Sequence, residues 1–344
     1  MEISKLGAFG LRDHIIEGLE ETCHASTLLG LTDDAALVAP TSGEQQLVAS
    51  QLLLEGIHFD LVYFPLQYLG FKAVTSAVAE IIGMGGTPRQ LTLSLGLSQR
   101  FKVEDVDVLM LGVKDALALY NIDLVGLEVS SSYTGLTIAV TALGSVAIGE
   151  ELRRSGAKKN DLLCLTGNVG AAYMGLQLLI REKVAFDGTA DFAPQFDGRE
   201  YILQRQMKPI ARLDILRQLQ ATGIKPTAMI SVRDGLASDL LQLCHASGVG
   251  ARIYEKAIPI DHETVGMADE LGLSPTLVGM NGGDDFELLF TIPLGLKDLV
   301  DAMEDVRQIG FITEAEDGVR LVSSGGSETT IVAQGYHREE EEDE

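Results

Sequence analysis

The sequence predicts an α+β protein built from two domains. Its 344 residues are 46% apolar, which is enough for two separate hydrophobic cores. The first half contains several apolar runs of strand length and two or three helical patterns, whereas the second half alternates strand and helix like an α/β layer. Residues 149–161 are mostly small or charged, so we place the domain boundary there, between residues 1–148 and residues 149–338.

The spacing of apolar residues defines the elements expected in the N-terminal domain. Helices are predicted over residues 11–19, 66–83 and 103–120. The second helix begins after Pro65 and ends at the run Gly83-Met84-Gly85-Gly86-Thr87-Pro88, where glycines and proline interrupt a helix. Strands are predicted over residues 35–38, 46–54, 90–97, 123–126 and 134–147, with a loop over residues 126–132.

The C-terminal domain is expected to be a layered α/β structure. Strands are predicted over residues 162–166, 227–232, 251–254, 288–292, 308–312 and 330–332. Helices are predicted over residues 171–181, 209–221 and 236–247. Residues 183–198 are polar and without periodicity, so we expect an exposed, irregular insertion there.

The charge of the chain limits its partners. Fifty acidic and 26 basic residues give a net charge of −24, and the tail of residues 339–344, predicted to be disordered, carries six of the negative charges. Such a chain repels nucleic acids and anionic membranes. No apolar run reaches the roughly 18 residues that a membrane span needs, and the N-terminus is polar. We therefore expect a cytoplasmic protein with neither a nucleic-acid nor a membrane partner.

The cysteines give no indication of a disulfide framework or a zinc site. Cys23, Cys164 and Cys244 are far apart in the sequence, and no C-x-x-C motif occurs. Buried free thiols in a reducing compartment are the expected state of all three.

Two glycine-rich loops are candidates for phosphate contacts, although neither matches a known phosphate-binding motif. The sequence contains no P-loop, and the run from Gly83 has Pro88 where a dinucleotide fingerprint needs its third glycine. The glycines at 83, 85 and 86 could simply cap the preceding helix. Residues 167–170 could present backbone N–H groups to an anion, or could form a tight turn between a strand and a helix.

Acidic residues recur at the ends of apolar elements. Mg²⁺ takes one or two carboxylates together with water and phosphate oxygens, often from separate segments, so a scattered set of acids suits it. A chain with fifty acids also places several of them at such ends by chance. His58 and the basic loop 153–158 have the same two interpretations, a phosphate contact or an ordinary structural position. The acids concerned are Asp33, Asp34, Glu80, Glu128, Asp234 and Asp284.

Five segments, taken in order, resemble the thiamine-monophosphate kinase family over residues 6–336. They are Gly30-x-Thr32-Asp33-Asp34-Ala35-Ala36, Glu55-Gly56-Ile57-His58-Phe59, Arg154-Ser155-Gly156-Ala157-Lys158, Asp234-Gly235-Leu236-Ala237-Ser238-Asp239 and Gly282-Gly283-Asp284-Asp285-Phe286-Glu287. The wider superfamily includes aminoimidazole ribonucleotide synthetase, selenophosphate synthetase and a hydrogenase maturation protein.

The resemblance implies a function, a fold and a set of site residues. It implies a homodimer whose N-terminal mixed sheets pair into a barrel, and transfer of a phosphoryl group from ATP, with Mg²⁺, to thiamine monophosphate. The implied catalytic residues are Asp34 and Asp234. The implied nucleotide contacts are Leu127, Glu128, Arg154 and Arg233. The implied substrate contacts are His58, Asp284 and Tyr336. The implied metal positions are Asp34, Ser50, Gln51, Glu80, Glu128, Ser231 and Asp234.

Several of these positions depart from the family pattern. Gln51 and Ser231 stand where the family has Asp, Glu80 and Glu128 are one carbon longer than Asp, and Leu127 replaces a glycine. Mg²⁺ demands near-octahedral oxygen ligands at about 2.0–2.1 Å, so these changes weaken the implied metal site. The alternative interpretation is therefore a weakened or inactive family member that only binds nucleotide or thiamine phosphates.

Overall fold

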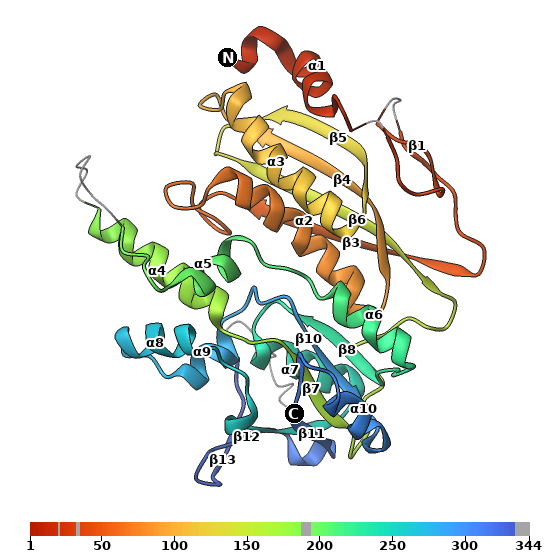
Figure 1. The fold of residues 1–344 in the computed structure, drawn as a ribbon, viewed down its shortest axis with the longest axis vertical. Helices are drawn as coiled ribbons and strands as arrows, with labels where there is room; N and C mark the ends of the chain where they lie inside the picture. Colours follow the sequence, from red (N-terminus) through yellow and green to blue (C-terminus); the bar gives the residue numbers. More distant parts are fainter. Residues whose placement is uncertain (20, 32–34, 187–193, 334–344) are drawn as a thin grey trace, which may run out of the picture. The chain divides into compact units, whose positions relative to one another are not determined.

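The computed structural model describes residues 1–19, 21–31, 35–186 and 194–333, and it has the mixed α+β architecture that the sequence predicts (Figure 1). The chain forms two compact units. The N-terminal unit comprises Met1–Glu151, Leu179–Phe192 and Met207–Leu213, and the C-terminal unit comprises Leu152–Leu178, Ala193–Gln206 and Asp214–Glu344. The assignment of residues 1–148 and 149–338 to two domains stays a prediction.

A four-stranded mixed sheet forms the centre of the N-terminal unit. Its strands lie in the order β3 (Glu44–Leu54), β6 (Thr137–Ala147), β4 (Thr87–Leu97) and β5 (Asp123–Ser131). The first two pairings are antiparallel, and β4 runs parallel to β5. A short antiparallel pair, β1 (Thr27–Leu29) and β2 (Leu37–Val38), and helix α1 (Ile3–Ile16), kinked at Gly7, also belong to this unit.

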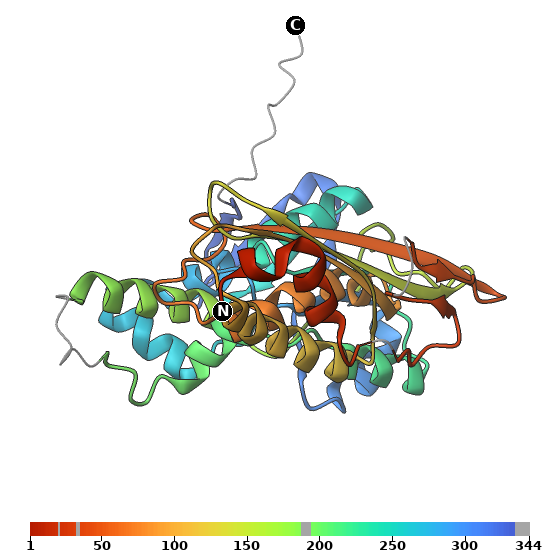
Figure 2. The ribbon, with the colours of Figure 1, turned by 90° about the horizontal axis from the view of Figure 1, so that it is seen from above.

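Two long helices cover one face of this sheet. They are α2 (Leu66–Gly83) and α3 (Val103–Tyr120), and both have the bounds that the sequence predicts. Figure 2 shows the strands of this unit as one layer with the two helices beneath them. Burial alternates along β6 with a period of two, as expected for a sheet that buries one face only.

Strand β5 is longer than expected, so the predicted loop over residues 126–132 is wrong. Residues 127–131 pair in parallel register with residues 93–97 of β4. The sequence Glu128 to Ser131 is polar enough to suggest a loop, but its alternate side chains point to the uncovered face. Backbone pairing to a neighbouring strand outweighs the local polarity in such a position.

The C-terminal unit contains a seven-stranded, mainly antiparallel sheet in the order β13-β12-β9-β11-β7-β10-β8. Its strands are β7 (Leu162–Thr166), β8 (Ala228–Val232), β9 (Gly250–Tyr254), β10 (Glu287–Ile292), β11 (Val306–Thr313), β12 (Val319–Val322) and β13 (Glu328–Thr330). Its fully buried strands β7, β8 and β10 pack with α7 (Leu236–Ser247) around one hydrophobic core. The other helices described beyond residue 170 are α4 (Ala171–Ala185), α5 (Glu200–Met207), α6 (Leu213–Thr222), α8 (His262–Glu270), α9 (Pro275–Asn281) and α10 (Lys297–Asp301).

The sequence pattern does not predict the short α-helices α5, α8, α9 and α10 or the short strands β1 and β12. Each is short, at most nine residues, and α5 buries only Ile202 and Gln206, so no clear periodicity marks these elements. The insertion expected over residues 183–198 instead begins with the last turn of α4. Residues 187–193 and the acidic tail of residues 339–344 lie outside the described residues.

Two further expectations concern the cysteines and the membrane. Cys164 and Cys244 are buried free thiols, but Cys23 is exposed, so the prediction for Cys23 is wrong. Cys23 lies in the loop before β1, where its backbone N–H donates to Asp123. Among the described helices, none combines the length and apolarity that a membrane span requires.

The two covering helices touch where each has a glycine. A Cβ atom added at Gly112 would lie 1.7 Å from the carbonyl oxygen of Gln67, and one added at Gly70 would lie 2.1 Å from that of Leu109. The backbones of α2 and α3 therefore approach as closely as only glycine allows.

We expect Gly112→Ala to lower the free energy of unfolding by about 1–3 kcal/mol, although alanine favours a helix by about 1 kcal/mol over glycine. The added methyl group would have to push the two helices apart. Urea denaturation followed by circular dichroism measures the change. The matched variant Leu111→Ala alters the exposed neighbouring position of α3 and should lose clearly less stability. Equal losses would contradict the packing argument.

Candidate functional site

The N-terminal unit places four of the predicted site residues on opposite edges of its sheet. Ser50 and Gln51 lie on β3, and Leu127 and Glu128 lie on β5. Two strands separate these edges, which corresponds to about 14 Å at the usual strand spacing. Gln51, Val140, Leu93 and Leu127 share one row across the sheet, facing the helix-covered side, whereas Glu128 is exposed on the other side. The structure does not bring Gln51 and Glu128 together.

Glu80 lies half-buried near the end of α2, and the glycine run follows it. The N–H of Gly85 donates to Ile82 and the N–H of Gly86 to Ile81, and Gly85 has a φ of 77°. This is the usual arrangement of a glycine cap at the end of a helix. The structure therefore favours the capping interpretation of these glycines over a phosphate-binding one.

His58 follows β3 in an exposed loop. Its Nδ1 accepts a hydrogen bond from the N–H of Leu54 at 3.0 Å, so this nitrogen is the acceptor and Nε2 carries the proton in the neutral ring. In the same loop, Asp60 pairs with Lys183 at 2.5 Å, and this ion pair holds the pKa of Asp60 below its ordinary value. The contact fixes the loop that carries His58 against α4.

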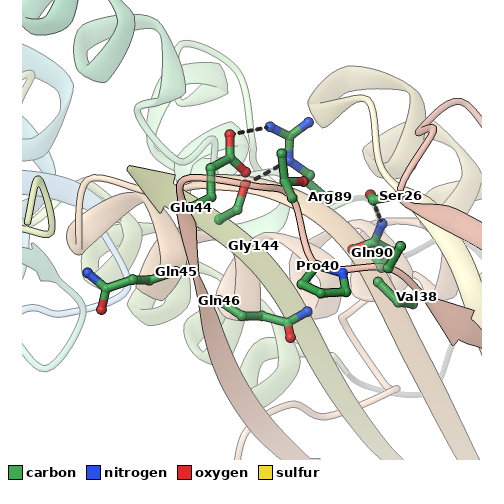
Figure 3. Close-up of a pocket in the computed structure, with 12 residues that line it drawn as sticks. Ser26, Val38, Pro40, Glu44, Gln45, Gln46, Arg89, Gln90 and Gly144 are labelled. Atoms are coloured by element: carbon green, nitrogen blue, oxygen red, sulfur yellow. Dashed lines mark hydrogen bonds and ion pairs between the residues drawn. The ribbon is translucent and has the colours of Figure 1, made fainter. Parts of the chain in front are cut away.

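Two cavities of the N-terminal unit are lined by residues other than the predicted site residues. A small hollow of about 30 Å³ lies beside the Arg89–Glu44 ion pair and has room for about one water molecule. Figure 3 shows the side chains that line it. A larger cavity of about 720 Å³ lies between α1 and the ends of β4 and β5, lined among others by Leu11, Phe101 and Ser130. Ser130 is two residues from Glu128, so this cavity opens near one predicted nucleotide contact.

Two loops at the ends of β8 and β10 gather the predicted residues of the C-terminal unit. The N–H of Asp284 donates to the carbonyl of Arg233 at 2.7 Å, and the N–H of Phe286 donates to Val232 at 2.8 Å. A Cβ atom at Gly283 would lie 2.9 Å from the carbonyl oxygen of Arg233, so the two loops are in close contact. Arg233, Asp234 and Asp284 are thereby neighbours, and Asp234 is exposed.

Asp239 supports this arrangement, although it received no role from the sequence. It lies buried in the first turn of α7, and its Oδ2 accepts the N–H groups of Arg233 at 2.8 Å and Asp234 at 3.0 Å. Burial and the charge of Asp234 raise the pKa of Asp239 to about 7. The sequence could have indicated this role, because Asp239 lies in the first turn of a predicted helix, five residues after Asp234, where a carboxylate interacts favourably with backbone N–H groups.

Arg154 joins the same cluster through a glutamine. Its guanidinium donates to Oε1 of Gln242 at 2.7 Å, and Gln242 in turn donates to Oδ1 of Asp239 at 3.4 Å. The positive charge of Arg154 acts to lower the pKa of Asp239, against the larger effect of burial. The C-terminal unit therefore presents cationic and anionic groups side by side around Asp234.

Ser231 lies on β8 beside this cluster, with its hydroxyl buried and no hydrogen-bond partner within the described part of the chain. Asp34 and Tyr336 lie outside the described residues. The described residues contain no group of three or more His, Cys, Asp or Glu side chains close enough to hold a metal ion. The roles expected for the site residues therefore stay predictions.

The glycine-rich turn over residues 167–170 is occupied by a carboxylate of the chain itself. Oδ2 of Asp285 accepts the N–H of Gly170 at 2.9 Å, and the N–H of Ala172 also bonds to this side chain. Asp285 thus caps the N-terminus of α4. The structure favours the tight-turn interpretation over an anion site for this loop.

Three comparisons place the chain among known proteins. A family model described as AIR synthase related protein, N-terminal domain, matches residues 32–146. The thiamine-monophosphate kinase of Aquifex aeolicus is 30% identical over 330 residues, which cover 94% of this chain and 99% of that protein. The thiamine-monophosphate kinase of Synechococcus elongatus is 32% identical over 310 residues, which cover 88% and 90%.

Solved structures agree with these sequence matches. The crystal structure of thiamine-monophosphate kinase from Stenotrophomonas maltophilia has a TM-score of 0.76 at 28% identity and covers 90% of this chain and 94% of that chain. AaThiL complexed with AMPPCP and TMP has a TM-score of 0.72 at 30% identity and covers 93% and 95%. Residues 32–146 thus match the N-terminal domain of AIR synthase related proteins, and the fold of most of the chain is similar to that of thiamine-monophosphate kinases. The chain belongs to the thiamine-monophosphate kinase family, as its motifs predict.

The buried carboxyl of Asp285 predicts a pH dependence of stability. Burial raises the pKa of Asp285 from its ordinary value of 3.8 to about 7. Between these values the folded chain holds a proton there that the unfolded chain has released, so this group's contribution to stability is lost as pH rises towards and through 7. Asn at this position has no proton to release.

We therefore expect the Tm of the wild-type chain to fall from pH 5 to pH 8 by more than the Tm of Asp285→Asn. Differential scanning calorimetry at several pH values measures both. The control Asp269→Asn, an exposed position of α8, should follow the wild-type curve. If the curve of Asp285→Asn runs parallel to that of the wild type, Asp285 does not carry this titration.

Proposed function

We propose that this chain is a kinase that transfers the γ-phosphoryl group of ATP to thiamine monophosphate, giving thiamine diphosphate and ADP. The observation that carries the proposal is the match to the Aquifex aeolicus kinase over 99% of that protein, joined by a similar structure that contains AMPPCP and TMP. AMPPCP is an ATP analogue, and TMP is the phosphate acceptor. In the reaction, an acceptor phosphate oxygen attacks the γ-phosphorus, and the bond to the β,γ-bridging oxygen breaks as ADP leaves.

Charged residues of the chain support this proposal. Phosphoryl transfer depends on positioning and on neutralising the phosphate oxygens. Arg154 and Arg233 are the cations we assign to ATP in the C-terminal unit, with Leu127 and Glu128 as further nucleotide contacts. His58, Asp284 and Tyr336 are assigned to thiamine monophosphate. Asp234 and Asp34 are assigned the catalytic role.

Mg²⁺ is the metal that we propose for this reaction, and when bound it would neutralise charge on the transferred phosphate. The donor set fits it in chemical type, because every proposed ligand offers oxygen. Asp234 is exposed, and the buried hydroxyl of Ser231 has no hydrogen-bond partner within the described residues. The proposed ligands are Asp34, Ser50, Gln51, Glu80, Glu128, Ser231 and Asp234.

We do not favour the alternative of a weakened or inactive family member. The relatives described above are named for the kinase reaction, and they match nearly the whole chain. Gln51 and Ser231 keep an oxygen donor where the family has a carboxylate. We also propose a cytoplasmic location, where ATP is available and the thiols of Cys164 and Cys244 stay reduced.

The uncovered face of the four-stranded sheet supports a homodimer, in which two such sheets would pair into a barrel. Val48 and Leu52 of β3 point to this face with 65% and 51% of their surfaces exposed. Large apolar side chains on the open face of a sheet are typical of an interface. A second copy would cover them with the same surface.

The kinase assay is the direct test of the proposed function. Purified protein with ATP, Mg²⁺ and thiamine monophosphate should form thiamine diphosphate, measured by chromatography. Asp234→Asn should lower kcat about 100-fold or more, because it removes a charge assigned to the reaction. Asp269→Asn removes an exposed charge from α8 and should leave kcat unchanged. No product above a reaction without enzyme would refute the proposal.

The dimer is tested by changing its proposed surface. The double variant Val48→Glu, Leu52→Glu should shift the wild-type dimer to a monomer in sedimentation velocity, because two copies would bury four unpaired charges. Val108→Glu changes an apolar residue of α3 that is 41% exposed, and should leave the dimer intact. A wild-type monomer, or a dimer that persists in the double variant, would exclude this interface.

A further inference from the structure

The turn that carries Asp284 has an unusual backbone. Asp284 and Phe286, on either side of Asp285, both lie in the left-handed region, with φ of 56° and 53°. Aspartate tolerates this region better than most residues, but a phenylalanine adopts it only where its surroundings impose it. The side chain of Phe286 is buried, and its N–H and that of Asp284 bond to the end of β8. Further contacts have to hold the two peptide groups between them.

Arg205 of α5 provides that contact. Its guanidinium donates at 2.8 Å to the carbonyl of Asp285, which belongs to the second of the two peptide groups that join Asp284 to Phe286. The same terminal nitrogen also lies 2.8 Å from Oε1 of Glu287 and donates to the carbonyl of Asn168 at 3.3 Å. The side chain of Arg205 is 15% exposed and that of Glu287 is 1% exposed. One nearly buried cation therefore joins the turn, the following strand and the 167–170 loop.

The carboxylates around Arg205 make the connection rigid. Thr166 donates its hydroxyl to Oε2 of Glu287 at 2.5 Å and accepts the N–H of Leu288 at 2.8 Å. Asp285 binds Gly170 from the other side of the turn. A Cβ atom at Gly167 would lie 2.2 Å from Oε1 of Glu287, so the backbone closes tightly around this carboxylate. The turn has little freedom to move.

The buried polar atoms of this cluster lower the stability of the folded chain. Oδ1 of Asp285 and Nε of Arg205 are buried without a hydrogen-bond partner among the described residues. Buried ion pairs of this kind are weak evidence for stability, and strained turns persist where a function needs their geometry. The groups that the guanidinium of Arg205 contacts, on Asn168, Asp285 and Glu287, are not among the residues assigned to ATP and Mg²⁺ above.

We propose that Arg205 is a positioning residue for the kinase reaction, which holds the 284–286 turn so that Asp284 faces thiamine monophosphate. The inference rests on the proposed function, in which Asp284 is a substrate contact, and it adds a residue that no motif identifies. Arg205 acts through the backbone of the turn and touches no substrate. Its loss should therefore weaken the use of thiamine monophosphate more than the use of ATP.

Arg205→Lys tests this with the least disturbance. Lysine keeps the positive charge opposite Glu287, but a single ammonium group cannot reproduce the planar fork of donors. We expect the KM for thiamine monophosphate to rise about tenfold, with less than a twofold change in the KM for ATP. The control Arg199→Lys alters the residue before α5, which pairs with Glu270 away from the turn, and should leave both KM values unchanged. Equal effects on both substrates, or none, would overturn the inference.

A double-variant cycle separates positioning from general structure. In the Asp284→Ala background, Arg205→Lys should cause no further rise in the KM for thiamine monophosphate, because the residue that it positions is gone. A full additional rise would overturn the inference. If Arg205→Lys does not fold, Glu287→Gln takes its place, because it removes the charge that anchors the guanidinium and should raise the same KM about threefold. An unchanged KM in Glu287→Gln would then overturn it.

Failure of the proposed function has a distinct signature. If the wild-type chain forms no thiamine diphosphate, the kinase proposal is refuted, and the claim that Arg205 aims Asp284 at this substrate is refuted with it. Hydrogen exchange measured by mass spectrometry reports on the turn independently of activity. Peptides covering residues 282–288 should exchange faster in Arg205→Lys than in Arg199→Lys. Equal exchange in an active enzyme would show that Arg205 does not hold the turn.

Discussion

Two backbone hydrogen bonds between the ends of β8 and β10 determine where the candidate site of the C-terminal unit forms. They join Asp284 to Arg233 and Phe286 to Val232, and they continue the antiparallel pairing of the two strands beyond the sheet. Because both loops leave the sheet at this point, the side chains they carry have to be neighbours. Strand pairing therefore determines the position of the candidate site in this unit, because it places the two loops that carry the charged residues side by side.

Buried carboxylates then fix the two loops in different ways. Asp239 binds the backbone N–H groups that precede Gly235, and Asp285 binds those that begin α4. Burial raises the pKa of each to about 7, so both are near the point where they can lose or keep a proton at neutral pH. The exposed Asp234, in contrast, is free of such burial. In this unit the buried carboxylates of Asp239 and Asp285 bind backbone N–H groups, whereas the exposed carboxylate of Asp234 can reach a ligand.

Long, strongly periodic elements could be predicted from the sequence, and short polar ones could not. The bounds of α2, α3, β7 and α7 were predicted correctly, because each is a continuous apolar pattern ended by glycine, proline or a charged turn. The second half of β5 was missed because its pairing with β4 is a tertiary contact.

The same distinction holds for the site. Motifs identified Asp234 and Asp284, but the role of Arg205 depends on α5, which has almost no pattern of its own. An arginine in a polar octapeptide resembles many surface arginines. The role proposed for it follows only from the packing of α5 against the end of β10, where the Arg205 side chain is 15% exposed.

The N-terminal sheet limits how the proposed metal ligands can be grouped. Two oxygen ligands of one Mg²⁺ lie within about 4 Å of each other, since each is about 2.0–2.1 Å from the ion. Gln51 and Glu128 start from edge strands about 14 Å apart and leave opposite faces of the sheet. Neither side chain is long enough to cross that distance around the sheet. Within one copy of the chain, these two residues therefore belong to different metal positions if both bind metal, and the replacement of Asp by Gln at 51 weakens only one of them.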